Sequence, residues 1–557
     1  MKKSIRNMTV LVALLACAGW SPTLVNAATP TENPSNYTNS GVQLNRTRQY
    51  LERQRVAQEI AADRKEAVIE GTETTSEKPV GAVHFVLKKV DLPKSAVLKS
   101  AELDSIVKPY IGKDVTLNDL NAIVEKINDL YRSKGFLTCR AFLSPQTIHA
   151  GKVHIDFIEG TNGKVTISGR GTTRENYIRH RVHIEPGKIQ DLNKLSDDLR
   201  RFNATNDAQL QITLLAGEKP RTTDYVISVK EPQEEVTGVF VDNAGMSTSG
   251  HYRAGMYWTD RNLTGNRDHL FFSTLRSDGV KAFSASYDTP INHIGTRAGL
   301  TYTSNSAHIT DGVFEQLGVK GHASSFTAYI TSPIVTSAHR KSEWGIEYGH
   351  QVAKTDIGTS INLRRHWADD KIDSLFFYYD QLDFGKSAVF YQKHGYRVGK
   401  YSTLYVDDRS FGKYETNMLY QKLFPSGQQW TLRLDGQLSG TDYLPAAELF
   451  YIGGLYSVRG YKENLLAGDS GVFASAQFSF PLTKSRKWKG FAFLDGGKVW
   501  GDSAYGDQDL AGVGVGVADE INKHTSFNVA LGFPLIKTVN GEEQSRARVH
   551  FSINSAF

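Results

Sequence analysis

Residues Trp430–Ser439, with the sequence WTLRLDGQLS, decide the fold class. The side chains of a β-strand point alternately to its two faces. One face here carries Trp430, Leu432, Leu434, Gly436 and Leu438, and the other carries Thr431, Arg433, Asp435, Gln437 and Ser439. A soluble β-sandwich buries such an apolar face in a core, whereas a membrane barrel turns it to lipid and keeps the polar face for a lumen. The stretch predicts a strand with one apolar and one polar face. The rest of the sequence must decide between a soluble β-sandwich and a membrane β-barrel.

The same alternation continues around this stretch, from Val236 onward. It recurs over 472–480 and 527–533, and the last strand sets Val549, Phe551, Ile553 and Phe557 against Arg548, His550, Ser552 and Asn554. Glycine- and asparagine-rich turns separate the strands. About 320 residues, at about 20 per strand and connection, give about 16 strands, and bacterial barrels have even numbers. We predict an all-β transmembrane barrel of about 16 antiparallel strands over 235–557, with a soluble all-β domain as the alternative.

Composition excludes several classes of protein. The chain has 557 residues, of which 40% are hydrophobic and 22% charged, so it is neither disordered nor a helical membrane protein in composition. No apolar run near 18 residues follows the N-terminal region, which excludes helical membrane spans but leaves a membrane β-barrel possible. The net charge of +6 is mild and scattered, so we expect no nucleic-acid partner.

The N-terminal region predicts export. Residues 1–27 have a basic start, a short apolar core and the cleavage-site pattern Val25-Asn26-Ala27, as in a signal peptide. A lipoprotein-like box ending at Cys17 is a competing interpretation. Residues 28–40 are polar and turn-rich, and we expect them to be disordered. After cleavage Cys139 is the only cysteine, which excludes an internal disulfide, and we interpret it as a small apolar residue of a strand.

Residues 41–68 predict one helix of unusual polarity. No glycine or proline interrupts it, and its few apolar side chains lie among many arginines. A helix that is polar nearly all round is a poor core element, so it must be a solvated spacer or occupy a polar lumen. Residues 69–80 read as a flexible linker.

Residues 81–234 contain an internal repeat. Gly112-Lys113-x-x-x-Leu117-Asn118-x-Leu120 recurs 75 residues later as Gly187-Lys188-x-x-x-Leu192-Asn193-x-Leu195. Each copy stands at the same place in a predicted β-α-α-β-β order, with the helix over 118–134 ending before a C-cap glycine, Gly135. We predict two tandem domains, 81–160 and 161–234; chance recurrence of a common helix start is the alternative.

Motifs for chemistry are missing from the sequence. It has no phosphate-binding loop, no zinc-binding pattern and no nucleophile elbow. His180 and His183 lack a third ligand, and a solvated basic face explains them better than a metal site. The glycine-rich run 512–516 has strand alternation and no following helix, so we interpret it as barrel wall packed against an obstruction. We expect no enzymatic activity, no metal and no cofactor.

Two motifs stand out within the barrel region, and they carry a family resemblance. Val458-Arg459-Gly460-Tyr461 lies in a stretch between strands that does not alternate, and Phe493-x-Asp495-x-Gly497 lies at the end of a following apolar strand. With two N-terminal repeat units, a leading helix and a 16-strand-sized barrel, the whole mature chain resembles the two-partner secretion transporters. These belong to the outer-membrane superfamily that joins POTRA domains to a barrel. The chain looks most like the haemolysin secretion/activation proteins of Serratia and Proteus type.

The resemblance implies a function and a set of partners. Periplasmic POTRA domains would bind the N-terminal secretion domain of a large exported partner, such as a haemolysin, cytolysin or related exoprotein. The barrel would cross the bacterial outer membrane, in contact with its lipid, and export the partner without ATP. The leading helix would plug the resting pore. Arg459 at an inward loop tip would meet Asp495 on the wall, and terminal Phe557 would be the signal recognised by the barrel assembly machinery.

Two other functions remain as alternatives. The first is an insertase of the same superfamily, which usually has more POTRA units and no plug helix. The second is a porin-like channel, which would have no need for about 150 residues of paired domains. The sequence names neither the passenger nor the oligomeric state.

Overall fold

A computed structural model describes residues 40–61, 69–70, 84–311, 315–337, 339–358, 365–404, 407–504, 507–522 and 524–557. The predicted signal peptide and the polar segment up to residue 39 lie outside these residues. The chain divides into two compact units, one of residues 64–232 and one that joins residues up to 63 with 233–557. Each unit is described by itself.

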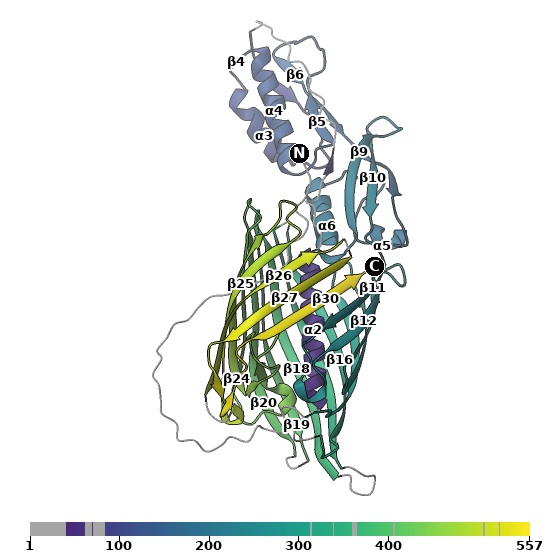
Figure 1. Ribbon diagram of the computed structural model, residues 1–557. Coiled ribbons are helices and arrows are strands. Elements are labelled where there is room, and N and C mark those ends of the chain that lie inside the picture. Colours follow the sequence, from purple (N-terminus) through teal and green to yellow (C-terminus); the bar gives the residue numbers. More distant parts are fainter. Residues whose placement is uncertain are drawn as a thin grey trace. The chain divides into compact units, whose positions relative to one another are not determined.

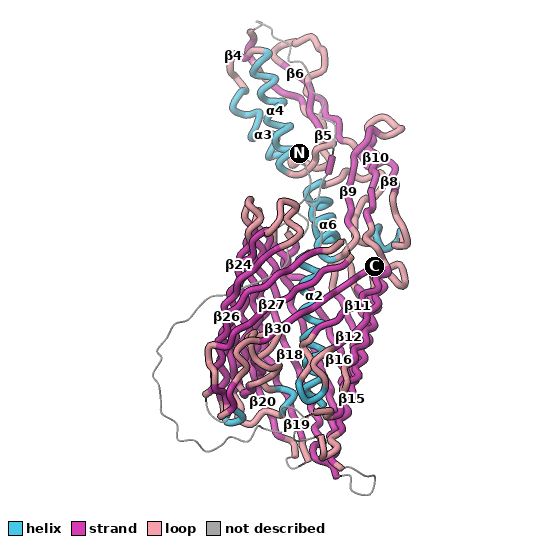
Figure 2. The backbone as a smooth tube through the Cα atoms, in the orientation of Figure 1, coloured by secondary structure: helices cyan, strands magenta, loops and turns pink. Residues whose placement is uncertain are grey.

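The second unit is a closed barrel of sixteen strands among the described residues (Figures 1 and 2). The strands are antiparallel neighbours in chain order, and the last pairs with the first through Gly238 opposite Ala556. This confirms the predicted fold. The strands are β11 (Glu235–Asp242), β12 (Arg253–Asp260), β13 (His269–Arg276), β14 (Val280–Pro290), β15 (Arg297–His308), β16 (Lys320–Thr336), β17 (Arg340–Ile357), β18 (Arg365–Phe384), β19 (Ala388–Ser402), β20 (Arg409–Leu423), β21 (Gln429–Ser439), β24 (Ser470–Pro481), β25 (Lys489–Trp500), β26 (Gln508–Glu520), β27 (Thr525–Pro534) and β30 (Arg548–Ala556).

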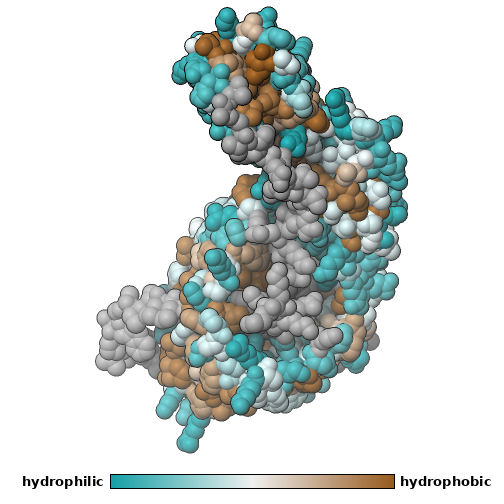
Figure 3. All heavy atoms as spheres, turned by 90° about the horizontal axis from the view of Figure 1, so that it is seen from above, coloured by the Kyte–Doolittle hydropathy of each residue, from teal (hydrophilic) through white to brown (hydrophobic). Residues whose placement is uncertain are grey.

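The barrel wall is apolar outside and polar inside. In the stretch that opened the sequence analysis, Trp430 and Leu438 are 38% and 54% exposed, whereas Thr431 and Gln437 are 0% and 6% exposed. The same inversion runs round the wall, and apolar side chains lie on its outer surface (Figure 3). A soluble sandwich would show the opposite arrangement, so the barrel prediction is confirmed against that alternative. Among the described residues, no helix is both long and apolar enough to cross a membrane.

Helix α2 (Ser40–Ala61) lies inside the barrel (Figure 1). It contacts wall strands from several sides, which only an element within the lumen can do: β15 through Asn305, β19 through Lys393 and β21 through Asp435. The helix begins at Ser40, one residue before the predicted start. The predicted end falls on 62–68, which lie outside the described residues.

The segment between β21 and β24 folds into the barrel instead of forming a plain turn. It contains the short helix η4 (Ala446–Glu448) and the hairpin of β22 (Phe450–Ile452) with β23 (Leu466–Gly468), whose tip is residues 453–465. We call this tip the inward loop. The barrel also carries the short elements η2 (Ser247–Ser249), η5 (Asp502–Ala504), β28 (Thr538–Val539) and β29 (Glu542–Glu543).

The other unit contains two domains of helices and strands, and the first has more short strands than the predicted β-α-α-β-β order. The first has β2 (Phe85–Val86), β3 (Lys89–Asp91), α3 (Ser100–Val107), η1 (Lys108–Tyr110), β4 (Asp114–Val115), α4 (Leu117–Ser133), β5 (Cys139–Phe142), β6 (Lys152–His154) and β7 (Asp156–Glu159). Thr116 caps α4 by accepting the backbone N–H of Asp119, and Gly135 follows its end with a φ of 83°. Leu120, Ile123 and Ile127 of α4 are buried in this domain's core.

The second domain has β8 (Thr161–Ser168), α5 (Glu175–Arg179), α6 (Leu192–Thr205), β9 (Gln209–Ala216) and β10 (Thr222–Lys230). Leu195, Leu199 and Phe202 of α6 are buried against its sheet. The first two residues of the predicted linker 69–80 are in a strand in the structure. Ile69–Glu70 form β1, which pairs in parallel with Ile212 and Thr213 of β9 at the edge of this sheet. Two residues suffice because the exposed edge of β9 supplies ready backbone partners.

Candidate functional site

The wall motif lies on β25 with its three residues facing inward. Phe493, Asp495 and Gly497 are two residues apart, so they share one face of the strand. Phe493 and Asp495 are 5% and 1% exposed. Gly497 leaves space for the inward loop, because a Cβ there would lie 3.2 Å from side-chain carbons of Ile452 and Val458. The motif is therefore a shaped receptor for a segment inside the barrel.

Arg459 of the inward loop occupies that receptor. Its guanidinium donates from Nε to Asp495 Oδ2 at 2.7 Å and from Nη2 to Asp495 Oδ1 at 2.9 Å. Its backbone N–H also donates to Asp495 Oδ2, at 3.1 Å. Nη1 donates to Gln477 Oε1 at 3.0 Å. The planar guanidinium thus makes the two-pronged contact with a carboxylate that lysine cannot make.

One further contact fixes the arginine and another fixes its carboxylate partner. The Cζ atom of Arg459 lies 3.4 Å from the ring centroid of Phe493, a cation–π contact. Ser475 Oγ donates to Asp495 Oδ1. The Arg459 and Asp495 side chains are only 7% and 0% exposed, so each charge depends on the other for its stabilisation.

The other residues of the loop motif anchor the tip. Val458 and Tyr461 are 0% and 1% exposed in one apolar cluster, and Tyr461 donates its hydroxyl to the carbonyl of Ala511 at 2.7 Å. Gly460 has a φ of 102°, a conformation that side chains disfavour. A Cβ at Gly512 would overlap the carbonyl oxygen of Arg459. Within the glycine run of β26, only Gly512 packs against the loop as predicted, whereas Gly514 and Gly516 make room for the rings of Phe493 and Phe491 on β25.

Helix α2 meets the wall mainly through polar and charged contacts. Asn305 donates to the Ser40 carbonyl at 3.0 Å, and Lys393 forms a 3.0 Å ion pair with Glu52. Arg53–Asp435 and Arg55–Asp380 are longer, both at 3.8 Å. Its few apolar residues pack on small patches of wall, such as Leu44 against Ala323 and Ala353. These contacts explain a helix that is polar on nearly every face.

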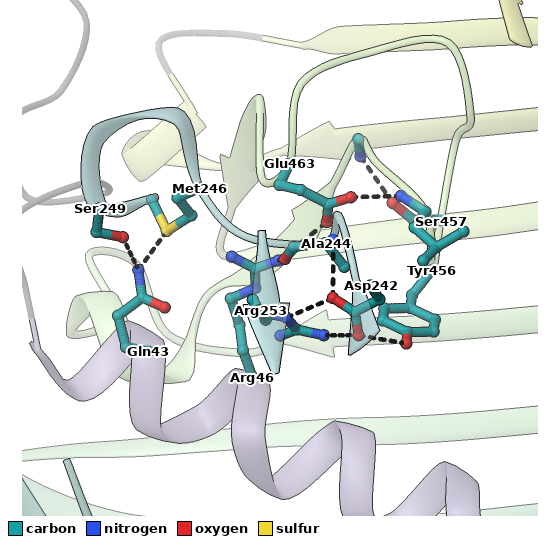
Figure 4. A network of polar contacts seen from close by, with 12 residues as sticks. Gln43, Arg46, Asp242, Ala244, Met246, Ser249, Arg253, Tyr456, Ser457 and Glu463 are labelled. Carbon is teal, nitrogen blue, oxygen red and sulfur yellow. Dashed lines mark hydrogen bonds and ion pairs between the residues drawn. The ribbon is translucent and has the colours of Figure 1, made fainter. Parts of the chain in front are cut away.

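The helix and the inward loop are joined by one carboxylate (Figure 4). Arg46 donates from Nη2 to Glu463 Oε2 at 2.9 Å and to the Ala244 carbonyl at 2.6 Å. The other oxygen of Glu463 accepts the backbone N–H of Leu455 at 2.5 Å, across the loop. A single side chain therefore braces the loop and holds the helix.

A second pair supports this junction from the wall. Arg253 donates to both oxygens of Asp242 at 2.8 Å, and Asp242 also accepts the Ala244 N–H at 2.9 Å (Figure 4). Tyr456 of the loop reaches Asp242 Oδ2 at 3.4 Å and lies 5.9 Å, ring to ring, from Tyr50 of α2. Helix, loop and the start of the barrel form one network.

The structure brings together Arg459 and Asp495, which the sequence motifs singled out, and also forms a junction that they did not indicate. Arg46 is one of several arginines on a polar helix, so its role has no local signal. Glu463 carried a usable signal, because it stands two residues after the motif in a stretch where most neighbours are apolar or small.

The remaining singled-out residues lie elsewhere. Phe557 pairs through its backbone with Thr237, and its ring is 58% exposed and 5.7 Å from that of His524. His183 pairs with Asp198 at 2.8 Å, and His180 ends α5. Cys139 is buried and free, and burial raises the pKa of its thiol to about 11, as suits a structural residue.

A polar-lined barrel that contains an inner helix and an inward loop, and that follows two domains of helices and strands in the sequence, is the architecture of the POTRA-containing outer-membrane transporters. The model of the haemolysin secretion/activation protein family ShlB/FhaC/HecB matches residues 222–518, and that of the ShlB-type POTRA domain matches 85–160. The chain belongs to the haemolysin secretion/activation family.

Individual relatives agree with this assignment. The chain is 23% identical over 475 residues to the heme/hemopexin transporter protein HuxB of Haemophilus influenzae (strain 86-028NP), covering 80% of this chain and 82% of that protein. It is 23% identical over 488 residues to the outer membrane transporter CdiB of Escherichia coli, covering 81% and 79%. The solved structure of CdiB from Escherichia coli superposes with a TM-score of 0.69 at 19% identity, covering 95% of this chain and 100% of that one.

The family membership confirms the main functional prediction over the insertase alternative. The protein is a two-partner secretion transporter, which exports a partner protein, with its barrel in the outer membrane and its POTRA domains in the periplasm.

Proposed function

We propose that this protein exports a large, unfolded secreted protein through the barrel lumen once α2 leaves it, and that a haemolysin-like exoprotein is the passenger. The observation that carries the proposal is the polar wall around α2. A lumen that solvates a polar helix also solvates an extended polypeptide, since neither meets hydrocarbon there.

The passenger first binds the second POTRA domain by adding a strand. An unfolded chain can pair with the free edge of a sheet, and β9 offers such an edge. Ile69–Glu70 already pair with that edge. A passenger strand at β9 therefore competes with β1, which lies eight residues beyond the end of α2. Binding of the passenger would therefore displace β1 from β9.

Removal of the plug then loosens the loop. When α2 departs, Glu463 loses Arg46 while still accepting the Leu455 N–H. The loss of one partner destabilises the closed position without breaking Arg459–Asp495. Folding of the passenger outside the cell supplies direction by removing it from the translocating pool.

Two further partners complete the proposal. Outer-membrane lipid surrounds the barrel through the exposed apolar residues of its outer face. The assembly machinery recognises the last strand, whose outward face carries Val549, Ile553 and Phe557.

Co-expression with a candidate passenger tests export. Passenger released to the medium in the presence of this protein, and retained in the periplasm without it, supports the proposal. Retention in both cases, with the barrel folded by heat-modifiable gel mobility, contradicts it for that passenger.

Two fragments test strand addition at β9. Residues 64–232 form a compact unit that includes β1, and residues 84–232 lack it. We expect both to bind the unfolded secretion domain at low salt, and the shorter to bind more tightly because nothing occupies β9. Equal affinity would remove the competition, and no binding by either would contradict passenger capture by the POTRA pair.

A further inference from the structure

The tip of the inward loop has a second contact with the wall, on β30. The backbone N–H of Gly460 donates to His550 Nε2 at 3.0 Å, and His550 is 1% exposed. A backbone N–H can only donate, so Nε2 must be the unprotonated nitrogen of the ring. His550 therefore acts as an acceptor whose sole described donor at this nitrogen is the loop tip.

The wall around His550 is shaped to admit the backbone of the tip. A Cβ on Gly532 of β27 would lie 2.6 Å from the Gly460 nitrogen and 2.9 Å from its Cα. A Cβ on Gly512 of β26 would overlap the Arg459 carbonyl oxygen. Since both obstacles are backbone atoms, the tip would have to move if either glycine carried a side chain.

These residues form a diagonal band across the inner face of four neighbouring strands, since Gly512 pairs with Pro534, two residues from Gly532. Asp495 of β25 pairs with Gly512 of β26, Gly532 of β27 pairs with Arg548 of β30, and His550 follows on the same face. The band runs from the arginine receptor to the strand that closes the barrel against β11.

We propose that His550, Gly512 and Gly532 form a slot for the backbone of the loop tip, in which His550 is a positioning residue that accepts the Gly460 N–H. The arginine receptor fixes the side chain of Arg459, and the slot fixes the backbone that follows it. The loop is thus tied to β30 as well as to β25. The Gly460 N–H is buried, and a buried N–H without an acceptor is costly. The imidazole nitrogen of His550 therefore stabilises this position of the loop tip.

Hydrogen–deuterium exchange of the full-length protein in lipid nanodiscs tests the slot, read on peptides covering residues 453–465. His550→Leu keeps the volume and removes the acceptor, so we expect exchange at the tip to rise about tenfold. His550→Gln retains an acceptor oxygen and restores exchange to within about twofold of the parent. Ser552→Ala, at the next inward position of β30, is the matched control and leaves the tip unchanged.

Gly532→Ala gives an independent test that leaves His550 in place. Its methyl group displaces Gly460, so we expect the same faster exchange at 453–465 while peptides of β27 and β30 remain protected. If His550→Leu fails to fold, Gly532→Ala alone tests the slot. Parent-like exchange in both His550→Leu and Gly532→Ala would overturn the slot. Equally fast exchange in the leucine and glutamine variants would overturn the role of His550 as acceptor.

Discussion

The inward loop and helix α2 both lie in the lumen, and they are held there in different ways. The loop tip depends on one arginine whose carboxylate partner is fully buried, with bonds of 2.7 and 2.9 Å. Helix α2 depends on many contacts, several of them long and partly exposed, such as Arg53–Asp435 at 3.8 Å, where the arginine side chain is 33% exposed.

The difference has an energetic meaning. Removing one partner of a buried ion pair costs about 3–5 kcal/mol, whereas an exposed pair contributes about 0–1 kcal/mol. Apart from the buried Arg46–Glu463 pair, the ion pairs of the helix are more exposed, so most of them can break one at a time at low cost. The loop tip is held by buried contacts on two strands, Arg459 with Asp495 on β25 and Gly460 with His550 on β30, so it leaves only when both are broken. Helix α2 is therefore held less firmly in the lumen than the loop tip is.

Deletion of residues 41–61 should have the largest effect on conductance. The helix lies in the lumen, so its loss should raise the ion conductance of the protein in planar bilayers. Secretion should continue, because the plug must leave during transport. Unchanged conductance would mean that the inward loop alone closes the pore, and it would contradict a role of α2 as a plug.

The Arg459–Asp495 pair should give the next largest effect. Arg459→Ala and Asp495→Ala should each lower passenger secretion, because each leaves a buried charge without its partner and destabilises the loop position by about 3 kcal/mol. The double variant should lower secretion little more than either single variant. Arg459→Lys should rescue only in part because it lacks the two-pronged contact.

A second ion pair on the barrel provides the control for that cycle. Arg340 and Asp383 have similar geometry, at 2.6 and 3.1 Å, but the arginine side chain is 51% exposed. Alanine at either position should change secretion little. Additive losses at Arg459 and Asp495, with folded barrel on heat-modifiable gels, would contradict a contact between them.

The junction between helix and loop should give an intermediate effect. Arg46→Ala leaves Glu463 buried without its cation, so we expect openings in planar bilayers to rise about tenfold. Glu463→Ala should do the same, and the pair should be non-additive, which measures the coupling of helix to loop. Additive effects would show that the two elements close the pore independently.

The smallest effect is expected at the far end of the helix. The Arg55 side chain is 44% exposed, and its distance to Asp380 is 3.8 Å. Arg55→Ala should therefore leave openings within about twofold of the parent. An effect as large as that of Arg46→Ala would mean that α2 is fixed along its whole length.

The sequence predicted what depends on local periodicity. Alternation by twos gave the strands and the facing of Phe493, Asp495 and Gly497, and the absence of an apolar face on α2 indicated its polar surroundings. The slot and the junction arise where distant segments meet. His550 could be placed on the polar face of the last strand, but its partner Gly460 is 90 residues away and offers only a backbone N–H. Likewise nothing in Ile69–Glu70 marks them as a strand, because β9 supplies the pairing.

The polar surface of α2 has a consequence for inhibition. A helix that needs no apolar core to be soluble can be made as a separate peptide of residues 40–61. Joined to the chain, it benefits from a high effective concentration at the pore, of the order of millimolar for short flexible tethers. Added freely to a plugless pore, it should behave as a soluble blocker that acts only near such concentrations. Removing residues from the Ala61 end of the peptide should reduce its blocking potency less than removing the N-terminal residues up to and including Arg46. The N-terminal half of the helix is therefore the template from which a tighter pore blocker would be designed.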